Sequence, residues 1–130
     1  MNKIEEGFLR LCLRPRVTCD LPGRLRLCFE KYRLLPEAAA PYLHYIRDVL
    51  ELLPGVLQAE INPRIGTALI RYDAAATDAR TILGWVDTVV DEGIRMFREG
   101  VWKNKGETEL EEIARRRLIL RLPQQKEGKV

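Results

Sequence analysis

The strongest constraint on the fold of this chain is a predicted β-hairpin that lies between two amphipathic helical segments. Residues Val56–Ile61 and Thr67–Tyr72 are typical of strands, and the turn-forming residues Asn62–Gly66 join them. Before the hairpin, residues 37–53 carry a one-sided apolar stripe at helical spacing, which Pro54-Gly55 ends. The sequence therefore predicts helix, strand and strand over this stretch.

A second helix is predicted after the hairpin. Thr77 or Asp78 can cap its first turn, and its apolar stripe extends from Ile82 to Val101, which predicts a helix of about 22 residues. A helix that only crosses a small sheet needs about 12–15 residues, so the C-terminal part overhangs the sheet. Either the N-terminal segment covers the apolar side chains of this overhang, or a partner protein or second copy does. These side chains form the candidate partner interface: Met96, Phe97, Val101 and Trp102.

Alternating residues at Arg24–Phe29 predict a strand before the first helix, with Leu25, Leu27 and Phe29 on one face. The order strand, helix, strand, strand, helix is one strand short of βαββαβ. We therefore expect an α+β fold, a ferredoxin-like βαββαβ sandwich with an N-terminal arm and extended C-terminal helices.

Two segments are candidates for the missing strand. Residues 118–122 follow a short helix predicted at 109–116, which opens with the capping-box pattern Thr108-x-x-Glu111. Residues 117–122 continue that helix equally well in the alternative interpretation. Phe8–Leu13 has a similar pattern and pairs at the same sheet edge in a third interpretation.

The chain of 130 residues is long enough for one hydrophobic core. We expect one domain at 15–122, an arm or edge strand at 1–14, and a polar tail at 123–130. No run of about 18 apolar residues is present, so we expect no direct membrane insertion. Residues 1–13 lack the continuous apolar stretch of a secretory signal, which predicts a cytoplasmic protein.

Several short motifs follow one another in an order that resembles the heavy-metal-associated domain superfamily, and most closely the branch that opens with a Pro-Gly-Arg-x-Arg strand. The matching residues lie between Val17 and about Val90: Pro22-Gly23-Arg24-Leu25-Arg26, Leu53-Pro54-Gly55-Val56, Asn62-Pro63 with Gly66, and Arg71-Tyr72-Asp73. The resemblance implies the βαββαβ fold and a role in metal or cofactor handling, with a membrane transporter as an expected partner.

The cysteines differ from the pattern of this superfamily. Its copper chaperones carry Cys-x-x-Cys between the first strand and first helix, whereas Glu30–Pro36 contains neither Cys nor His. In the divergent branch a His stands three residues before Pro-Gly-Arg, and here Cys19 takes that place. Cys19 and Cys28, with Cys12, are the candidate ligands for a soft metal, Cu(I) or Zn(II). The alternative is that they are small buried thiols without a ligand role.

The single histidine, His44, is predicted on the polar face of the first helix, where solvent surrounds it. Haem binding, through a Cys or His axial ligand with arginines on the propionates, is a third and weaker hypothesis.

Arginines form a candidate basic face on the strands, and the sequence as a whole has basic ends and an acidic middle. Such a face steers docking to an acidic protein surface. An RNA-binding module on this fold needs outward aromatic residues, which the Arg24–Phe29 strand lacks, so we expect no nucleic-acid partner. The alternative is a solvated sheet with charges that protect its edges. The residues of the face are Arg14, Arg16, Arg24 and Arg26.

No catalytic constellation, phosphate-binding loop or dinucleotide motif occurs in the sequence. We therefore expect a small non-enzymatic binding or adaptor module that binds a soft metal through Cys19 and Cys28. The alternative is a metal-free structural or regulatory subunit that docks a protein partner, or a second copy, through its long second helix.

Overall fold

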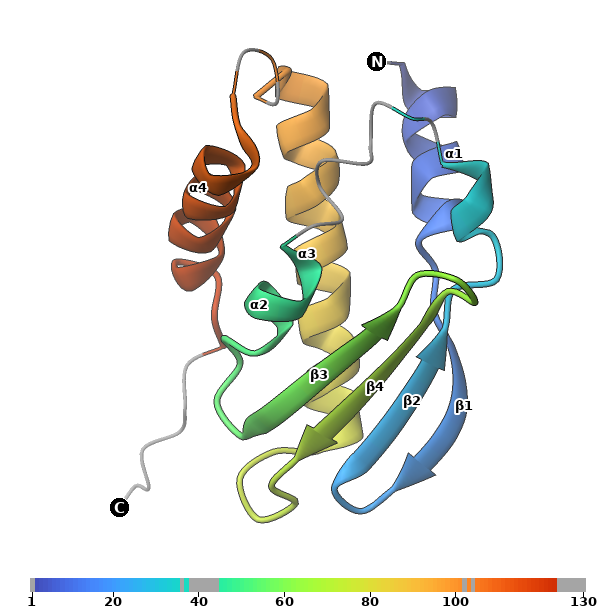
Figure 1. The fold of residues 1–130 in the computed structure, drawn as a ribbon, viewed down its shortest axis with the longest axis vertical. Helices are drawn as coiled ribbons and strands as arrows, with labels where there is room; N and C mark the ends of the chain where they lie inside the picture. Colours follow the sequence, from blue (N-terminus) through green and yellow to red (C-terminus); the bar gives the residue numbers. More distant parts are fainter. Residues whose placement is uncertain (1, 36, 38–44, 102, 104, 124–130) are drawn as a thin grey trace.

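The computed structural model describes residues 2–35, 37, 45–101, 103 and 105–123. A four-stranded sheet forms one layer and the helices form the other (Figure 1). In chain order the elements are α1 (Lys3–Cys12), β1 (Arg16–Leu21), β2 (Arg24–Cys28), the 3-10 helix η1 (Tyr32–Leu34), α2 (Ile46–Leu50), β3 (Val56–Asn62), β4 (Thr67–Tyr72), α3 (Ala79–Glu99) and α4 (Glu107–Ile119). Among the described helices, none has both the length and the apolar content needed to cross a bilayer.

The sheet has the order β1-β2-β4-β3, and all neighbouring strands are antiparallel. The predicted hairpin is confirmed as β3 and β4, and the predicted strand Arg24–Phe29 as β2. The α+β class is therefore correct. The order βαββαβ is not the order of the structure, because β1 precedes β2 and a helix, α4, follows α3.

The N-terminal segment is a helix, so the edge-strand interpretation of residues 1–14 is wrong. Asn2 caps α1: its side chain accepts a hydrogen bond from the Glu5 N–H at 2.8 Å, and the Glu5 carboxylate accepts one from the Asn2 N–H at 3.2 Å. Leu9 and Cys12 are the buried residues of this helix. The sheet edge is taken instead by β1, which Pro22-Gly23 joins to β2 in a tight hairpin with Gly23 at φ 83°.

Residues 117–122 do not form a strand. Helix α4 extends to Ile119 because Leu110, Ala114 and Leu118, spaced four residues apart, are all buried in the core. The predicted capping box is also wrong: α4 begins at Glu107, so Thr108 already lies inside the helix, and the cap Gly106 has no side chain to offer.

The long second helix is confirmed as α3, whose 21 residues begin after Asp78. The Asp78 carboxylate accepts a hydrogen bond from the Thr81 N–H at 2.8 Å and caps the first turn. Of the first predicted helix, Ile46–Leu50 is helical, and residues 38–44 lie outside the described residues. Trp85 links the two helices, since its indole N–H donates to the Val49 carbonyl at 2.9 Å.

Charged side chains tie α1 and α4 to the outer side of α3. Asp91 on α3 accepts hydrogen bonds from Arg10 of α1 at 2.7 Å and from Arg121, just after α4, at 2.9 Å. Arg121 also donates to Glu92, which is buried, at 2.9 Å. The three helices thus form one unit on a single face of the sheet.

Candidate functional site

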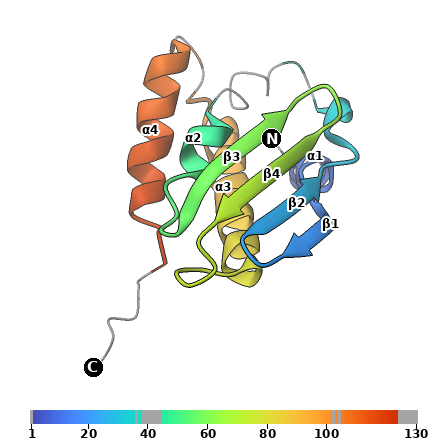
Figure 2. The ribbon, with the colours of Figure 1, turned by 60° about the horizontal axis from the view of Figure 1, so that its bottom comes forward.

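The opposite face of the sheet is not covered by any described helix (Figures 1 and 2). Strand β2 shows how the sequence divides the two faces, because Leu25 and Leu27 are fully buried against the helices while Arg24 and Arg26 are exposed. Strand β4 follows the same alternation, with Ala68, Ile70 and Tyr72 buried. The outward positions of these two central strands are thus Arg24, Arg26, Cys28, Thr67, Leu69 and Arg71.

The register brings arginines together on the uncovered face. Arg24 lies directly opposite Arg71, Arg26 is two residues further along β2, and Arg16 of β1 lies opposite Cys28. We call Arg16, Arg24, Arg26 and Arg71 the arginine face. Like charges directly opposite on neighbouring strands are destabilising, so this arrangement is not explained by stability.

Only part of this positive charge is balanced by the residues that the structure describes. Arg71 Nε lies 3.7 Å from a Glu60 carboxylate oxygen, and an Arg16 guanidinium nitrogen lies 3.1 Å from a Glu30 carboxylate oxygen. Arg24 and Arg26 form no ion pair with any residue in the described part of the chain. Their guanidinium groups are available to an external anion.

A trough of about 510 Å³ runs along the outward side of β4. Thr67 and Leu69 form its floor, Arg24 and Arg26 form the wall on the β2 side, and Glu60 and Asn62 form the wall on the β3 side. The turn that joins β3 to β4 closes one end. The residues of that turn in the lining are Pro63, Arg64 and Ile65.

The candidate basic residues are placed as follows. Arg16, Arg24 and Arg26 lie on the uncovered face as expected, whereas Arg14 lies in the turn between α1 and β1, where its N–H donates to the Leu11 carbonyl at 3.3 Å. Arg71 was not among the candidates. The alternation of β4 could have identified it, because residues 67, 69 and 71 must share the face opposite to Ala68 and Ile70.

The three cysteines are free and are not gathered at one place. Cys19 lies opposite Arg26, so Cys19 and Cys28 are diagonal neighbours on the uncovered face, about 7 Å apart. Cys12 is buried on α1 in the helical layer, and burial raises the pKa of its thiol, with Lys31 opposing the shift. Within the described ranges, no three His, Cys, Asp or Glu residues are placed to hold a metal ion. His44 lies outside the described residues.

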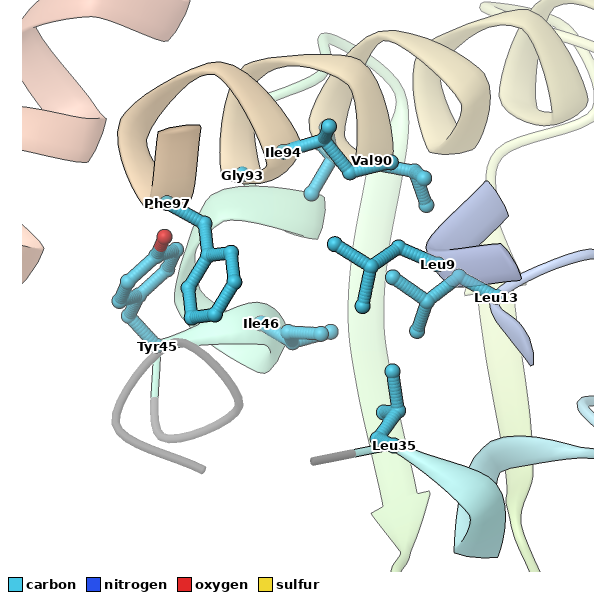
Figure 3. A pocket seen from close by; sticks show the side chains of 10 residues that line it. Leu9, Leu13, Leu35, Tyr45, Ile46, Val90, Gly93, Ile94 and Phe97 are labelled. Carbon is cyan, nitrogen blue, oxygen red and sulfur yellow. The ribbon is translucent and has the colours of Figure 1, made fainter. Parts of the chain in front are cut away.

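The overhang of α3 is packed by the same chain. Met96 is fully buried and lies 3.9 Å from the Tyr45 hydroxyl, so it does not present a surface to a partner. Phe97 and Val101 are partly buried against the core. Phe97 also lines an apolar cavity of about 50 Å³ together with Leu9 of α1, as Figure 3 shows. Trp102 lies outside the described residues.

A larger hollow of about 1080 Å³ lies between α2, α3 and the covered side of β3 and β4. Two of its polar lining residues, Glu51 and Tyr32, are engaged by the fold itself. Glu51 accepts a hydrogen bond from the Ala59 N–H at 2.8 Å and so closes the free edge of β3, and the Tyr32 hydroxyl donates to the Pro63 carbonyl. The uncovered face, with unpaired cations beside a trough, is the stronger candidate for a binding site.

Comparison of the chain with protein-family models, curated proteins and solved structures gives no match.

Proposed function

We propose that this protein is a small non-enzymatic binding module that docks an acidic surface of a partner protein through the arginine face. The observation that carries the proposal is the pair Arg24 and Arg26, which lie exposed on an uncovered sheet and have no acidic partner among the described residues. A carboxylate-rich partner would relieve the repulsion between Arg24 and Arg71, and long-range attraction would speed its approach.

A protein partner fits this face better than a nucleic acid does. Binding of single-stranded nucleic acid on a sheet relies on outward aromatic side chains that stack on the bases. The outward positions of β2 and β4 carry Arg, Cys, Thr and Leu, and Tyr72 is on the buried side. Leu69 on the trough floor instead offers apolar contact, as the centre of a protein interface does.

The architecture supports a relation to the ferredoxin-like sandwich. Strands β2, β3 and β4 with helices α2 and α3 follow the order strand, helix, strand, strand, helix. We propose that β1 takes the sheet edge at which a last strand would pair in βαββαβ. The resemblance to heavy-metal-associated domains then extends over this unit, and a membrane transporter with an acidic cytoplasmic surface is a partner of the proposed kind.

Poly-L-glutamate tests the proposed function, because it presents carboxylates without a specific sequence. The double variant Arg24→Gln/Arg26→Gln is expected to bind it at least about fivefold more weakly than the unmodified protein. Arg80→Gln/Arg116→Gln is the matched control, since it removes the same charge from exposed helix positions. If the two double variants lose the same affinity for polyglutamate, the claim that the arginine face is the binding site is contradicted. Tighter binding of poly-uridylate than of polyglutamate contradicts a protein partner.

A second candidate function, soft-metal binding, is favoured by the diagonal placement of Cys19 and Cys28. Two thiolates that share one ion lie at most about 4.6 Å apart, so both side chains must turn toward each other. Two soft ligands suit Cu(I) better than Zn(II), which takes four in structural sites. After anaerobic loading of the reduced protein with Cu(I), Zn(II) or haem in turn, we expect about one equivalent of Cu(I), lost in Cys19→Ser. No binding above background contradicts this second function and leaves the first intact.

A further inference from the structure

The trough beside Arg24 and Arg26 is too narrow for a helix. Its two walls stand on β2 and β3, which are separated by the single strand β4 and are therefore about 10 Å apart. The arginine, glutamate and asparagine side chains that form the walls occupy part of this width. An α-helix with its side chains is about 10–12 Å in diameter, whereas a single extended chain is narrower.

We infer that the acidic surface of the partner is an extended segment that lies along β4 in this trough, with acidic side chains at alternate residues. This inference rests on the proposed function and specifies the form of its partner. The cationic groups of the wall, Arg24 and Arg26, are two residues apart on one strand, which corresponds to about 7 Å. Residues i and i+2 of an extended segment point to the same side at the same spacing, so two carboxylates can face the two guanidinium groups.

The wall on the β3 side of the trough determines which residues of the partner segment can alternate with its acidic residues. Alternate side chains of an extended segment point away from the arginines toward Glu60 and Asn62. Glu60 already holds Arg71, and Asn62 accepts a hydrogen bond from the Arg64 N–H at 3.0 Å. A further carboxylate on this side would meet the negative charge of Glu60. The intervening residues of the partner segment are therefore not acidic.

Two fluorescein-labelled peptides of equal length and composition test the inference by anisotropy. In one, Glu and Ser alternate; in the other, Glu residues occur in adjacent pairs separated by pairs of Ser. In an extended conformation only the alternating peptide places every Glu on one side. We expect it to bind about two- to fivefold more tightly than the paired peptide, since it forms one more charged contact in the trough.

Thr67→Phe provides the control for the trough itself. It fills the floor with a bulky side chain and leaves every arginine in place. We expect the preference for the alternating peptide to disappear in this variant, with thermal unfolding used to verify the fold.

The outcomes separate the inference from the function on which it rests. The two peptides could bind equally well, and Arg24→Gln/Arg26→Gln could weaken the binding of both. That result overturns the inference of an extended segment and still supports an acidic partner. Retention of the preference in Thr67→Phe also overturns the inference, because the trough is then not where the peptide lies. If neither peptide nor polyglutamate binds the unmodified protein, the proposed function fails as well.

Discussion

Arg24 on β2 lies directly opposite Arg71 on β4, and both side chains are on the face of the sheet that the described helices leave uncovered. Glu60 balances Arg71 from the other side, at 3.7 Å, but Arg24 has no such partner in the described residues. The repulsion between Arg24 and Arg71 lowers the stability of the folded protein. An external anion bound over the two side chains would offset that repulsion, which gives the pair a role in binding.

This relationship predicts opposite effects of one substitution on stability and on binding. Arg24→Gln removes the repulsion across β2 and β4, so the free energy of unfolding should increase by about 0.2–1 kcal/mol. The same variant should bind polyglutamate about two- to fivefold more weakly. Urea unfolding and a binding titration on one protein preparation measure both. A loss of stability in Arg24→Gln would show that Arg24 serves the fold.

The charge cluster that joins the three helices predicts an acid-sensitive stability. Burial raises the pKa of Asp91, but hydrogen bonds from Arg10 and Arg121 outweigh burial, and the pKa lies below its ordinary value. A lowered carboxyl pKa adds stability above the unfolded-state pKa, and this stability is lost as pH falls through the folded-state pKa. Asp91→Asn should therefore cost roughly 1–3 kcal/mol at pH 7, and progressively less as the pH falls below the ordinary aspartate pKa of about 3.9. Urea titrations over a series of pH values test this, and a constant cost would contradict it.

The cavity in Figure 3 predicts a stabilising substitution. Gly93 lies in the interior of α3 and lines the cavity, and a Cβ at this position would meet no atom within 4 Å. Gly93→Ala should stabilise the protein by about 1 kcal/mol, since alanine is the better helix former and fills empty space. Gly55→Ala is the contrasting variant, because Gly55 has φ 95° and its Cβ would lie 2.8 Å from the Thr77 Cγ2. Gly55→Ala should destabilise, and stabilisation by it would contradict the turn geometry.

The end of α4 can be tested by comparing two leucines. Leu118 is 1% exposed and Leu120 is 85% exposed. Leu118→Ala should cost roughly 2–5 kcal/mol, whereas Leu120→Ala should change stability by less than about 0.5 kcal/mol. In a strand over 118–122 these two residues would share one face and contribute alike, so similar costs in thermal unfolding would favour the strand.

Periodicity identified the elements that have one clearly buried face. Strand β2 alternates cleanly because it is central, and α3 carries a continuous stripe after its Asp78 cap. Strand β1 could not be predicted this way, since an edge strand with no helix beneath it buries little. Its residues are nearly all exposed, and the register shifts between Val17 and Cys19.

Two errors came from short segments whose apolar residues suit a strand as well as a helix. In Phe8–Leu13 the deciding signal was the Asn2 and Glu5 capping box, which lies outside the apolar stretch. In 118–122 it was burial of Leu110, Ala114 and Leu118 on one side of α4. The arginine face was only partly predictable, because the approach of Arg71 to Arg24 depends on the pairing of β2 with β4, which are more than 35 residues apart in the chain.

The most direct test of the account is a map of backbone amide chemical shifts in the isotope-labelled protein as polyglutamate is added. We expect the shifts to concentrate in β2, in β4 and in the turn at 63–66, and to be absent from α1 and α4. Shifts centred on the helical layer, with β2 and β4 unchanged, would contradict the claim that the uncovered face of the sheet is the binding site.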